Sequence, residues 1–330
     1  MSIFEIPVID YASDTGDCIR RNVFEINKKQ LAVGIMRVLC AKKPSKDFRK
    51  IIKKSAMDIL NLMIDPSRSG GIYINSEYVD VISSDKKNID VGKLAESICY
   101  CYWYWGGKYR FINGFLPYAK REGITIEARS KHADFIMTNI SGSNAIMESK
   151  GTLRKKYNEP MNEALTQVRS VMPYVKAKEG WGCVVTFNYP DGPASLHLRD
   201  PMDDKFIPDR ISYEIFRSSF ASWFELFDMD DVAVWCRNPN PTNELSKSNL
   251  LNRMNDCSKN NFLTKRLFDV LGFNSQKAKF RLNPLILDFL FDYSNFKEIK
   301  YEPLKYNHAK TIIRENEPFL CPDGMEIWPE

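Results

Sequence analysis

Three residues near the middle of the chain combine the types and the spacing needed to hold a metal ion. Asp134 lies in the apolar run 133–137, and Glu148 closes the next apolar run, two residues before Lys150. Two carboxylates on adjacent strands repel each other, and a divalent cation that takes oxygen ligands, such as Mg²⁺, commonly stabilises such a pair. Side chains two residues apart on a strand share a face, so Glu148 and Lys150 would point the same way. The pattern predicts a magnesium site with a lysine beside it.

The segments that carry these residues predict an α/β unit. Apolar residues at three- and four-residue intervals indicate helices, and short β-favourable runs between polar turns indicate strands. The expected order is helix, three strands, helix and strand, at residues 91–105, 123–129, 133–137, 144–148, 158–176 and 182–187. In this order, Asp134 lies on the second strand of the unit and Glu148 at the end of the third.

The motif residues, Ala133-Asp134 and then Ile146-Met-Glu-Ser-Lys-Gly-Thr152, resemble the PD-(D/E)xK nuclease superfamily, which includes many restriction endonucleases. The order of the predicted elements resembles the core of that family. The proline that usually precedes the first acid is Ala133 here, a change that removes no metal ligand. The resemblance implies a restriction endonuclease-like core at 91–190, in which helices flank a mixed central sheet. It also implies a nuclease activity that depends on Mg²⁺, with Mn²⁺ as a substitute.

The resemblance also implies a role for each motif residue. Asp134 and Glu148, together with the backbone carbonyl of Ser149, would bind one or two divalent ions. Lys150 would position the attacking water or help to deprotonate it. Many family members place a glutamine on the next helix, facing the metals, which makes Gln167 a candidate catalytic residue. A solvated helix position is the alternative for Gln167.

A further acid often comes from the helix before the first strand, where Glu96 is the best placed metal ligand. Glu127, on the first predicted strand, is the competing choice. Glu96 lies beside the aromatic cluster 99–105, which we interpret as core packing in preference to a base-stacking platform. His132 is expected in a surface turn, with a phosphate contact as the alternative. No pair of the three histidines has metal-ligand spacing, so zinc chemistry is not expected.

The two flanks predict less. Residues 1–90 are expected to be mainly helical, with helices at 24–42 and 46–64 and short strands at 72–74 and 78–82. A cationic face between residues 42 and 54 would bind nucleic acid or a partner, unless it is simply solvated. It contains Lys42, Lys43, Lys46, Arg49, Lys50, Lys53 and Lys54. Residues 191–330 are expected to form an α+β extension of unknown role, with helices at 212–227, 245–255 and 282–293 and a strand at 232–236.

Composition narrows the class of protein. The chain has 330 residues, of which 44% are hydrophobic and 27% charged, and these values are typical of a globular protein. Eight scattered cysteines form no C-x-x-C pair, and no apolar run approaches the ~20 residues of a membrane span. We therefore expect a cytoplasmic protein without a disulfide framework. The absence of a glycine-rich phosphate loop argues against ATP hydrolysis.

Together these features predict a metal-dependent nuclease that hydrolyses phosphodiester bonds. DNA is the expected substrate, RNA stays open, and anti-phage defence or DNA repair would be natural settings. No membrane partner is expected, and a homo-oligomer or a larger complex is possible. The alternative is a non-catalytic nucleic-acid-binding or assembly subunit that retains a nuclease fold.

Overall fold

The structure is a computed structural model. It describes the chain except for residues 1–2, 13–15, 42–45, 107–108, 126–131, 140–143, 176, 178, 201–208, 239–244, 261–263, 265–266, 269–270, 272, 274–277, 293–317 and 329–330. Along residues 46–54, 209–212 and 258–260 it describes the helical backbone but not the side chains.

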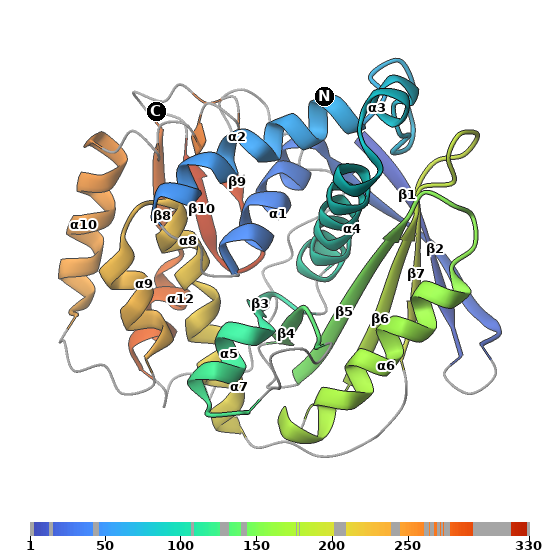
Figure 1. Cartoon of the computed structure of the whole chain (residues 1–330). Coiled ribbons are helices and arrows are strands. Elements are labelled where there is room, and N and C mark those ends of the chain that lie inside the picture. Colours follow the sequence, from blue (N-terminus) through green and yellow to red (C-terminus); the bar gives the residue numbers. More distant parts are fainter. Residues whose placement is uncertain are drawn as a thin grey trace.

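A mixed seven-stranded sheet forms the centre of the molecule (Figure 1), in the order β2-β1-β7-β6-β5-β4-β3. Its strands are β1 (Ile3–Tyr11), β2 (Cys18–Asn27), β3 (Phe111–Gly114), β4 (Phe135–Thr138), β5 (Asn144–Thr152), β6 (Glu179–Thr186) and β7 (Ser195–Arg199). The β1–β7 and β5–β6 pairs are parallel, and the other neighbours are antiparallel. The expected α/β class with a mixed central sheet flanked by helices is confirmed.

Helices pack against the seven-stranded sheet and, together with a second and smaller sheet, form the rest of the molecule. They are α1 (Lys28–Ala41), α2 (Lys46–Met63), α3 (Ser76–Val81), α4 (Ser84–Gly106), α5 (Phe115–Arg121), α6 (Asn158–Val175), α7 (Asp209–Ser219), α8 (Ala221–Leu226), α9 (Asp230–Arg237), α10 (Lys247–Asn260) and α12 (Pro284–Phe291). A three-stranded antiparallel sheet completes the fold, with β10 (Met325–Trp328) between β8 (Lys279–Leu282) and β9 (Phe319–Leu320). No described helix is long and apolar enough to cross a membrane.

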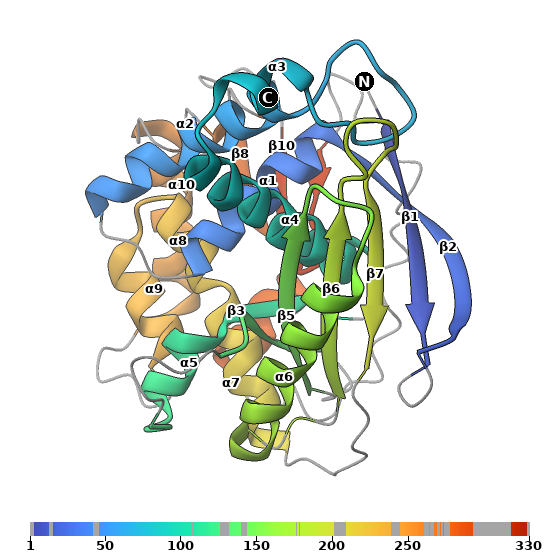
Figure 2. The ribbon, with the colours of Figure 1, turned by 45° about the vertical axis from the view of Figure 1, so that its right-hand side comes forward.

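The two faces of β5 are covered by different helices, because successive side chains on a strand point to opposite faces. Ile146 packs in one apolar cluster with Val168 of α6, which lies in front of β5 and β6 in Figure 2. Gly151 faces α4 instead. A Cβ at Gly151 would lie 2.7 Å from the Cβ of Ala95 and 2.8 Å from the carbonyl oxygen of Val91, so close packing of α4 requires glycine there.

Several segments differ from the sequence prediction. The predicted helix at 24–42 begins only at Lys28, because β2 extends to Asn27, and β1 was not predicted. The predicted strand at 78–82 is helix α3, which begins where the Asn75 side chain accepts a hydrogen bond from the N–H of Glu77. At 72–74 only an isolated bridge, from Ile74 to Ile64, is present.

The predicted strand at 232–236 is also wrong, because this segment lies in helix α9. β-branched Val232 and Val234 favour a strand locally, but burial at three- and four-residue intervals and two acids in the first turn favour the helix. The first strand of the α/β unit was misplaced as well. It is β3 at Phe111–Gly114, residues 124–125 form no strand, and 126–129 lie outside the described residues.

The other predicted elements are present, with shifted ends. The helices at 46–64, 91–105, 158–176, 245–255 and 282–293 correspond to α2, α4, α6, α10 and α12, and the segment 212–227 contains two helices, α7 and α8. The strands at 133–137, 144–148 and 182–187 correspond to β4, β5 and β6. One hydrophobic core nevertheless includes residues from 1–90, 91–190 and 191–330, and the boundary drawn at residue 90 falls inside α4.

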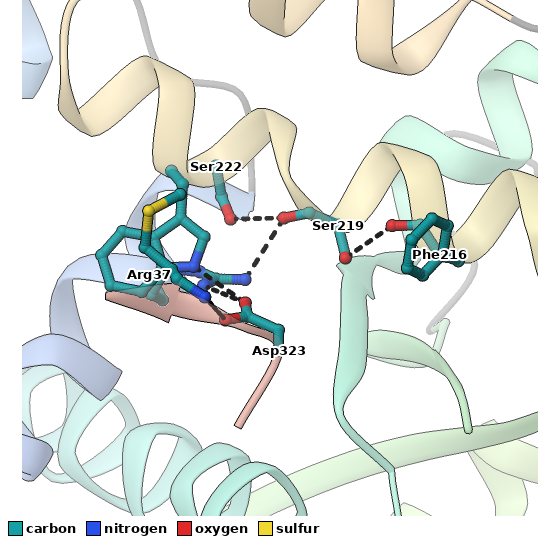
Figure 3. A network of polar contacts seen from close by, with 7 residues as sticks. Arg37, Phe216, Ser219, Ser222 and Asp323 are labelled. Carbon is teal, nitrogen blue, oxygen red and sulfur yellow. Dashed lines mark hydrogen bonds and ion pairs between the residues drawn. The ribbon is translucent and has the colours of Figure 1, made fainter. Parts of the chain in front are cut away.

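A buried ion pair ties the beginning of the chain to its end. Nη1 of Arg37, on α1, donates to Oδ2 of Asp323 at 2.9 Å, and both side chains are fully buried. Nη2 of Arg37 donates to the carbonyl oxygen of Ser219, and the hydroxyl of Ser222 donates to the same oxygen (Figure 3). Nε1 of Trp223 adds a second hydrogen bond to Asp323 Oδ2, at 2.8 Å.

Candidate functional site

Asp134 and Glu148 lie close together at two neighbouring strands. β4 and β5 are antiparallel with Phe135 opposite Met147, and the N–H of Asp134, which immediately precedes β4, donates to the carbonyl oxygen of Met147 at 3.1 Å. The charge of Asp134 is near enough to raise the pKa of Glu148. Like charges repel each other, so negative charge is concentrated at this point.

Ser149 holds the Asp134 carboxylate in place. Its backbone N–H and its hydroxyl both donate to Oδ2 of Asp134, at 3.0 and 2.6 Å. The resemblance implied a role only for the backbone carbonyl of Ser149. The structure adds a role for the rest of this residue, which orients the first acid of the motif.

Lys150 and Gln167 hold the second acid. Nζ of Lys150 donates to Oε1 of Glu148 at 2.6 Å, on the face of β5 that α6 covers. The Gln167 amide satisfies its surroundings when its nitrogen donates to Glu148 Oε1 at 2.8 Å and its oxygen accepts from Lys150 Nζ at 2.9 Å. Gln167 is buried and is therefore not the solvated helix residue that was the alternative. The four residues converge at one place.

Glu148 is a carboxyl group in an environment that disfavours its charge. The side chain is only 3% exposed, and Oε2 is buried without a hydrogen-bond partner among the described residues. Its pKa is raised to about 9, first by burial, then by the nearby charge of Asp134 and to a smaller extent by Glu96, while Lys150 acts in the opposite direction. The site therefore contains more acid than its own cation neutralises.

The donor set fits an open magnesium site. Mg²⁺ is usually bound through one or two carboxylates and keeps several waters, so it needs no cage of protein side chains. In the described part of the chain, no group of three or more His, Cys, Asp or Glu side chains has a metal-binding arrangement. Asp134 and Glu148 are two carboxylates at adjacent strands, and the buried Oε2 of Glu148 is an oxygen suited to a cation. These carboxylate oxygens are the ligands that Mg²⁺ prefers, so the site needs no histidine or cysteine ligand.

The further acids have separate outcomes. Glu96 is buried on α4 and is close enough for its charge to affect Glu148, although its role as a ligand stays a prediction. Glu127 lies outside the described residues. The aromatic cluster beside Glu96 is core, as predicted, because Tyr100, Trp103 and Tyr104 are buried.

His132 is more buried than the sequence predicts. His132 is half-buried rather than on an open surface turn, its ring stacks on Phe115, and Nδ1 lies 3.0 Å from the carbonyl oxygen of Ala133. Its own carbonyl accepts from the Gln167 amide at 3.2 Å. The side chains of the cationic face, from residue 42 to residue 54, lie outside the described ones.

A pocket beside Asp134 was missed by the sequence analysis. It has a volume of about 840 Å³ and lies between α5 and α9, so we call it the α5–α9 pocket. Lys120, Arg121 and Arg237 contribute cations to its lining, and Asp134 and His132 lie on its wall. The adjacent basic pair at 120–121 was the only available signal, since α9 had been predicted as a strand.

Comparisons of this chain with protein-family models, with curated proteins and with solved structures found no match. The assignment of function therefore rests on the residues and their geometry.

Proposed function

We propose that this protein is a metal-dependent nuclease of the PD-(D/E)xK type, with a restriction endonuclease-like core. The observation that carries the proposal is the convergence of Asp134, Glu148, Lys150 and Gln167 at one cluster, in which Glu148 and Gln167 are buried and Asp134 and Lys150 partly buried. Bringing an excess of acid together and partly burying it costs free energy in the folded protein. Such costly arrangements concentrate at functional sites, which favours a functional role for this cluster.

The order of the elements supports the same proposal. The chain runs from α4 through β3, the short helix α5, β4 and β5 to α6, and then to β6, which pairs parallel with β5. Apart from the insertion of α5 between the first two strands, this is the helix, three strands, helix and strand order of the family that the motif resembles. Asp134 immediately precedes the second of these strands, β4, and Glu148 lies on the third, β5, which supports the proposal.

Each residue has a role in the proposed hydrolysis. Asp134 and Glu148 would hold Mg²⁺ or Mn²⁺, with the Ser149 carbonyl as a further oxygen and Glu96 as a candidate ligand. The bound ion would lower the pKa of a water and neutralise charge developing on the phosphate. Lys150 would position the water, and Gln167 keeps the Lys150 and Glu148 side chains in a fixed relation.

A cleavage assay tests this proposal. Supercoiled plasmid, linear duplex, single-stranded DNA and RNA are each incubated with the protein in Mg²⁺ or in a chelator. We expect Mg²⁺-dependent cleavage of DNA that is lost in Glu148→Gln and retained in Glu159→Gln. Glu159 is a matched control because it is an exposed acid in the first turn of α6. Cleavage in the chelator, or full activity of Glu148→Gln, would contradict the proposal.

A further inference from the structure

The α5–α9 pocket opens directly beside the candidate acids, because Asp134 is part of its lining. Its volume of about 840 Å³ lies within the range of roughly 300–1,000 Å³ that is typical of pockets for small ligands. A double helix is too large to enter such a space. The pocket therefore suits a single unit of a polymer more than a duplex.

Apolar side chains from both helices face this space. Leu116 on α5 is 45% exposed and Val234 on α9 is 57% exposed, and both line the pocket. The His132 ring adds a flat surface, held at a ring-centroid distance of 6.3 Å from Phe115 with 28° between the planes. Nucleobases stack on flat side chains of this kind, histidine included.

The charges of the pocket suit a phosphate. Its described lining contains three cations, Lys120, Arg121 and Arg237, but only one acid, Asp134. Arg121 and Arg237 form ion pairs with Glu122 and Glu225 respectively.

Lys120 is exposed and makes no ion pair with another described residue. A phosphate is the natural partner of such a lysine in the lining of this pocket.

From these observations we infer that the α5–α9 pocket binds one unpaired nucleotide of a DNA strand, with the base against His132 and Val234 and a phosphate at Lys120. The inference rests on the proposed nuclease function, since it places this nucleotide next to Asp134. A base can enter only after leaving its stack, so the pocket selects single-stranded, frayed or mismatched DNA over intact duplex.

Binding of a labelled oligonucleotide of about 12 nucleotides, measured by fluorescence anisotropy in a chelator, tests the pocket without requiring cleavage. The same sequence is measured as a blunt duplex. The variants are Val234→Glu, Lys120→Glu and His132→Ala, with His132→Phe to keep a flat ring. Val81→Glu is the control for Val234→Glu, because Val81 is 74% exposed on α3. Lys156→Glu, at an exposed position before α6, matches the charge change of Lys120→Glu.

We expect the three pocket variants to weaken single-strand binding by roughly tenfold, with little change in duplex binding, and His132→Phe to bind like the wild type. Unchanged single-strand binding in all three variants, or an equal loss for both DNA forms, would overturn the inference. The two proposals fail separately. A protein that binds single strands through this pocket but never cleaves DNA refutes the nuclease function alone, and an active nuclease insensitive to these changes refutes the pocket alone.

Discussion

Two of the ionic clusters in the described part of the molecule differ in how their charges are balanced. At Arg37 and Asp323, one cation meets one acid, and the acid also accepts from Trp223 and from the N–H of Met325. At the candidate site, Lys150 pairs with Glu148, but the charge of Asp134 also acts on Glu148, and Glu148 Oε2 has no hydrogen-bond partner among the described residues. In the first cluster one cation balances one acid, although Nε of Arg37 also has no hydrogen-bond partner among the described residues, whereas in the second the acids outnumber the cation.

This difference separates a structural pair from a candidate site. A buried ion pair in which one cation balances one acid can join distant parts of a chain, as the Arg37–Asp323 pair joins α1 to the turn before β10. A cluster with surplus acid costs free energy in the folded protein, and such perturbed groups concentrate at functional sites. Changes in the two clusters should accordingly affect different properties, stability in one and activity in the other.

The largest effect is expected on cleavage, from changes at the candidate site. Asp134→Ala, Glu148→Ala and Lys150→Ala should each lower the cleavage rate by about a thousandfold or more, because metal ligands and the activated water act as a unit. The fold should stay intact, because Asp134 and Lys150 are partly exposed, and because Glu148, whose pKa is raised to about 9, can stay buried in its neutral form when a charged partner is removed. Rates on DNA and urea unfolding curves, measured on the same preparations, check both halves of this prediction.

The Arg37–Asp323 pair should respond in the opposite way. Arg37→Met leaves Asp323 charged and buried without a cation, and we expect a loss of about 3–5 kcal/mol in the free energy of unfolding. Cleavage per folded molecule should not change. Lys247→Met, which breaks an exposed pair with Asp288, is the control and should cost no more than about 1 kcal/mol.

The double variant Arg37→Met/Asp323→Leu sharpens this test. If the cost of Arg37→Met comes from an uncompensated charge, removing both partners should restore much of the lost stability. A double variant as unstable as Arg37→Met would show that packing around the Arg37 side chain matters more than its charge.

We expect His197, a buried histidine with a hydrogen-bond partner at each ring nitrogen, to make the fold sensitive to acid. His197 on β7 has Tyr11 Oη 2.9 Å from Nδ1 and Thr186 Oγ1 3.1 Å from Nε2, and burial lowers its pKa to about 4. A base whose folded pKa is below its ordinary value of 6.5 stabilises the fold above pH 6.5. That contribution is lost as the pH falls from about 6.5 to about 4, and it amounts to about 3 kcal/mol.

Unfolding free energies measured from pH 7 to pH 4 test this prediction. The His197→Gln variant should lose less stability over this range than the wild type, because its side chain does not titrate. Parallel curves for the two proteins would mean that His197 does not govern the acid response.

The sequence predicted which residues of the candidate site lie together better than it predicted the molecule around them. Asp134, Glu148 and Lys150 could be grouped because a strand alternates its side chains and because an acid in an apolar run is conspicuous. These rules need only local sequence. Gln167 needed the family resemblance, since a glutamine on an amphipathic helix carries no signal of its own.

The errors arose where tertiary packing decides the outcome. β2 pairs with β1, and β1 pairs with β7, which lies about 190 residues further along the chain. Local patterns carry no information about such a partner. The segment of α9 favoured a strand by composition, yet burial on one face fixed it as a helix. The α5–α9 pocket was invisible for the same reason, because its two walls meet only in the fold.

The smallest predicted effect concerns Gln167, whose amide gives Glu148 and Lys150 an additional hydrogen-bond partner. In the amide orientation that satisfies its surroundings, its nitrogen donates to Glu148 and its oxygen accepts from Lys150, so the residue positions both groups. We expect Gln167→Leu to lower metal affinity or the cleavage rate by roughly 10–100-fold, as is usual for residues that orient ligands. A positioning role predicts that a higher Mg²⁺ concentration recovers part of the rate, whereas a purely structural role predicts lower stability at every Mg²⁺ concentration. Cleavage measured across a Mg²⁺ titration, beside the exposed neighbour Thr166→Val, separates the two. Full activity of Gln167→Leu at low Mg²⁺ would show that the Lys150–Glu148 pair holds its geometry without the amide.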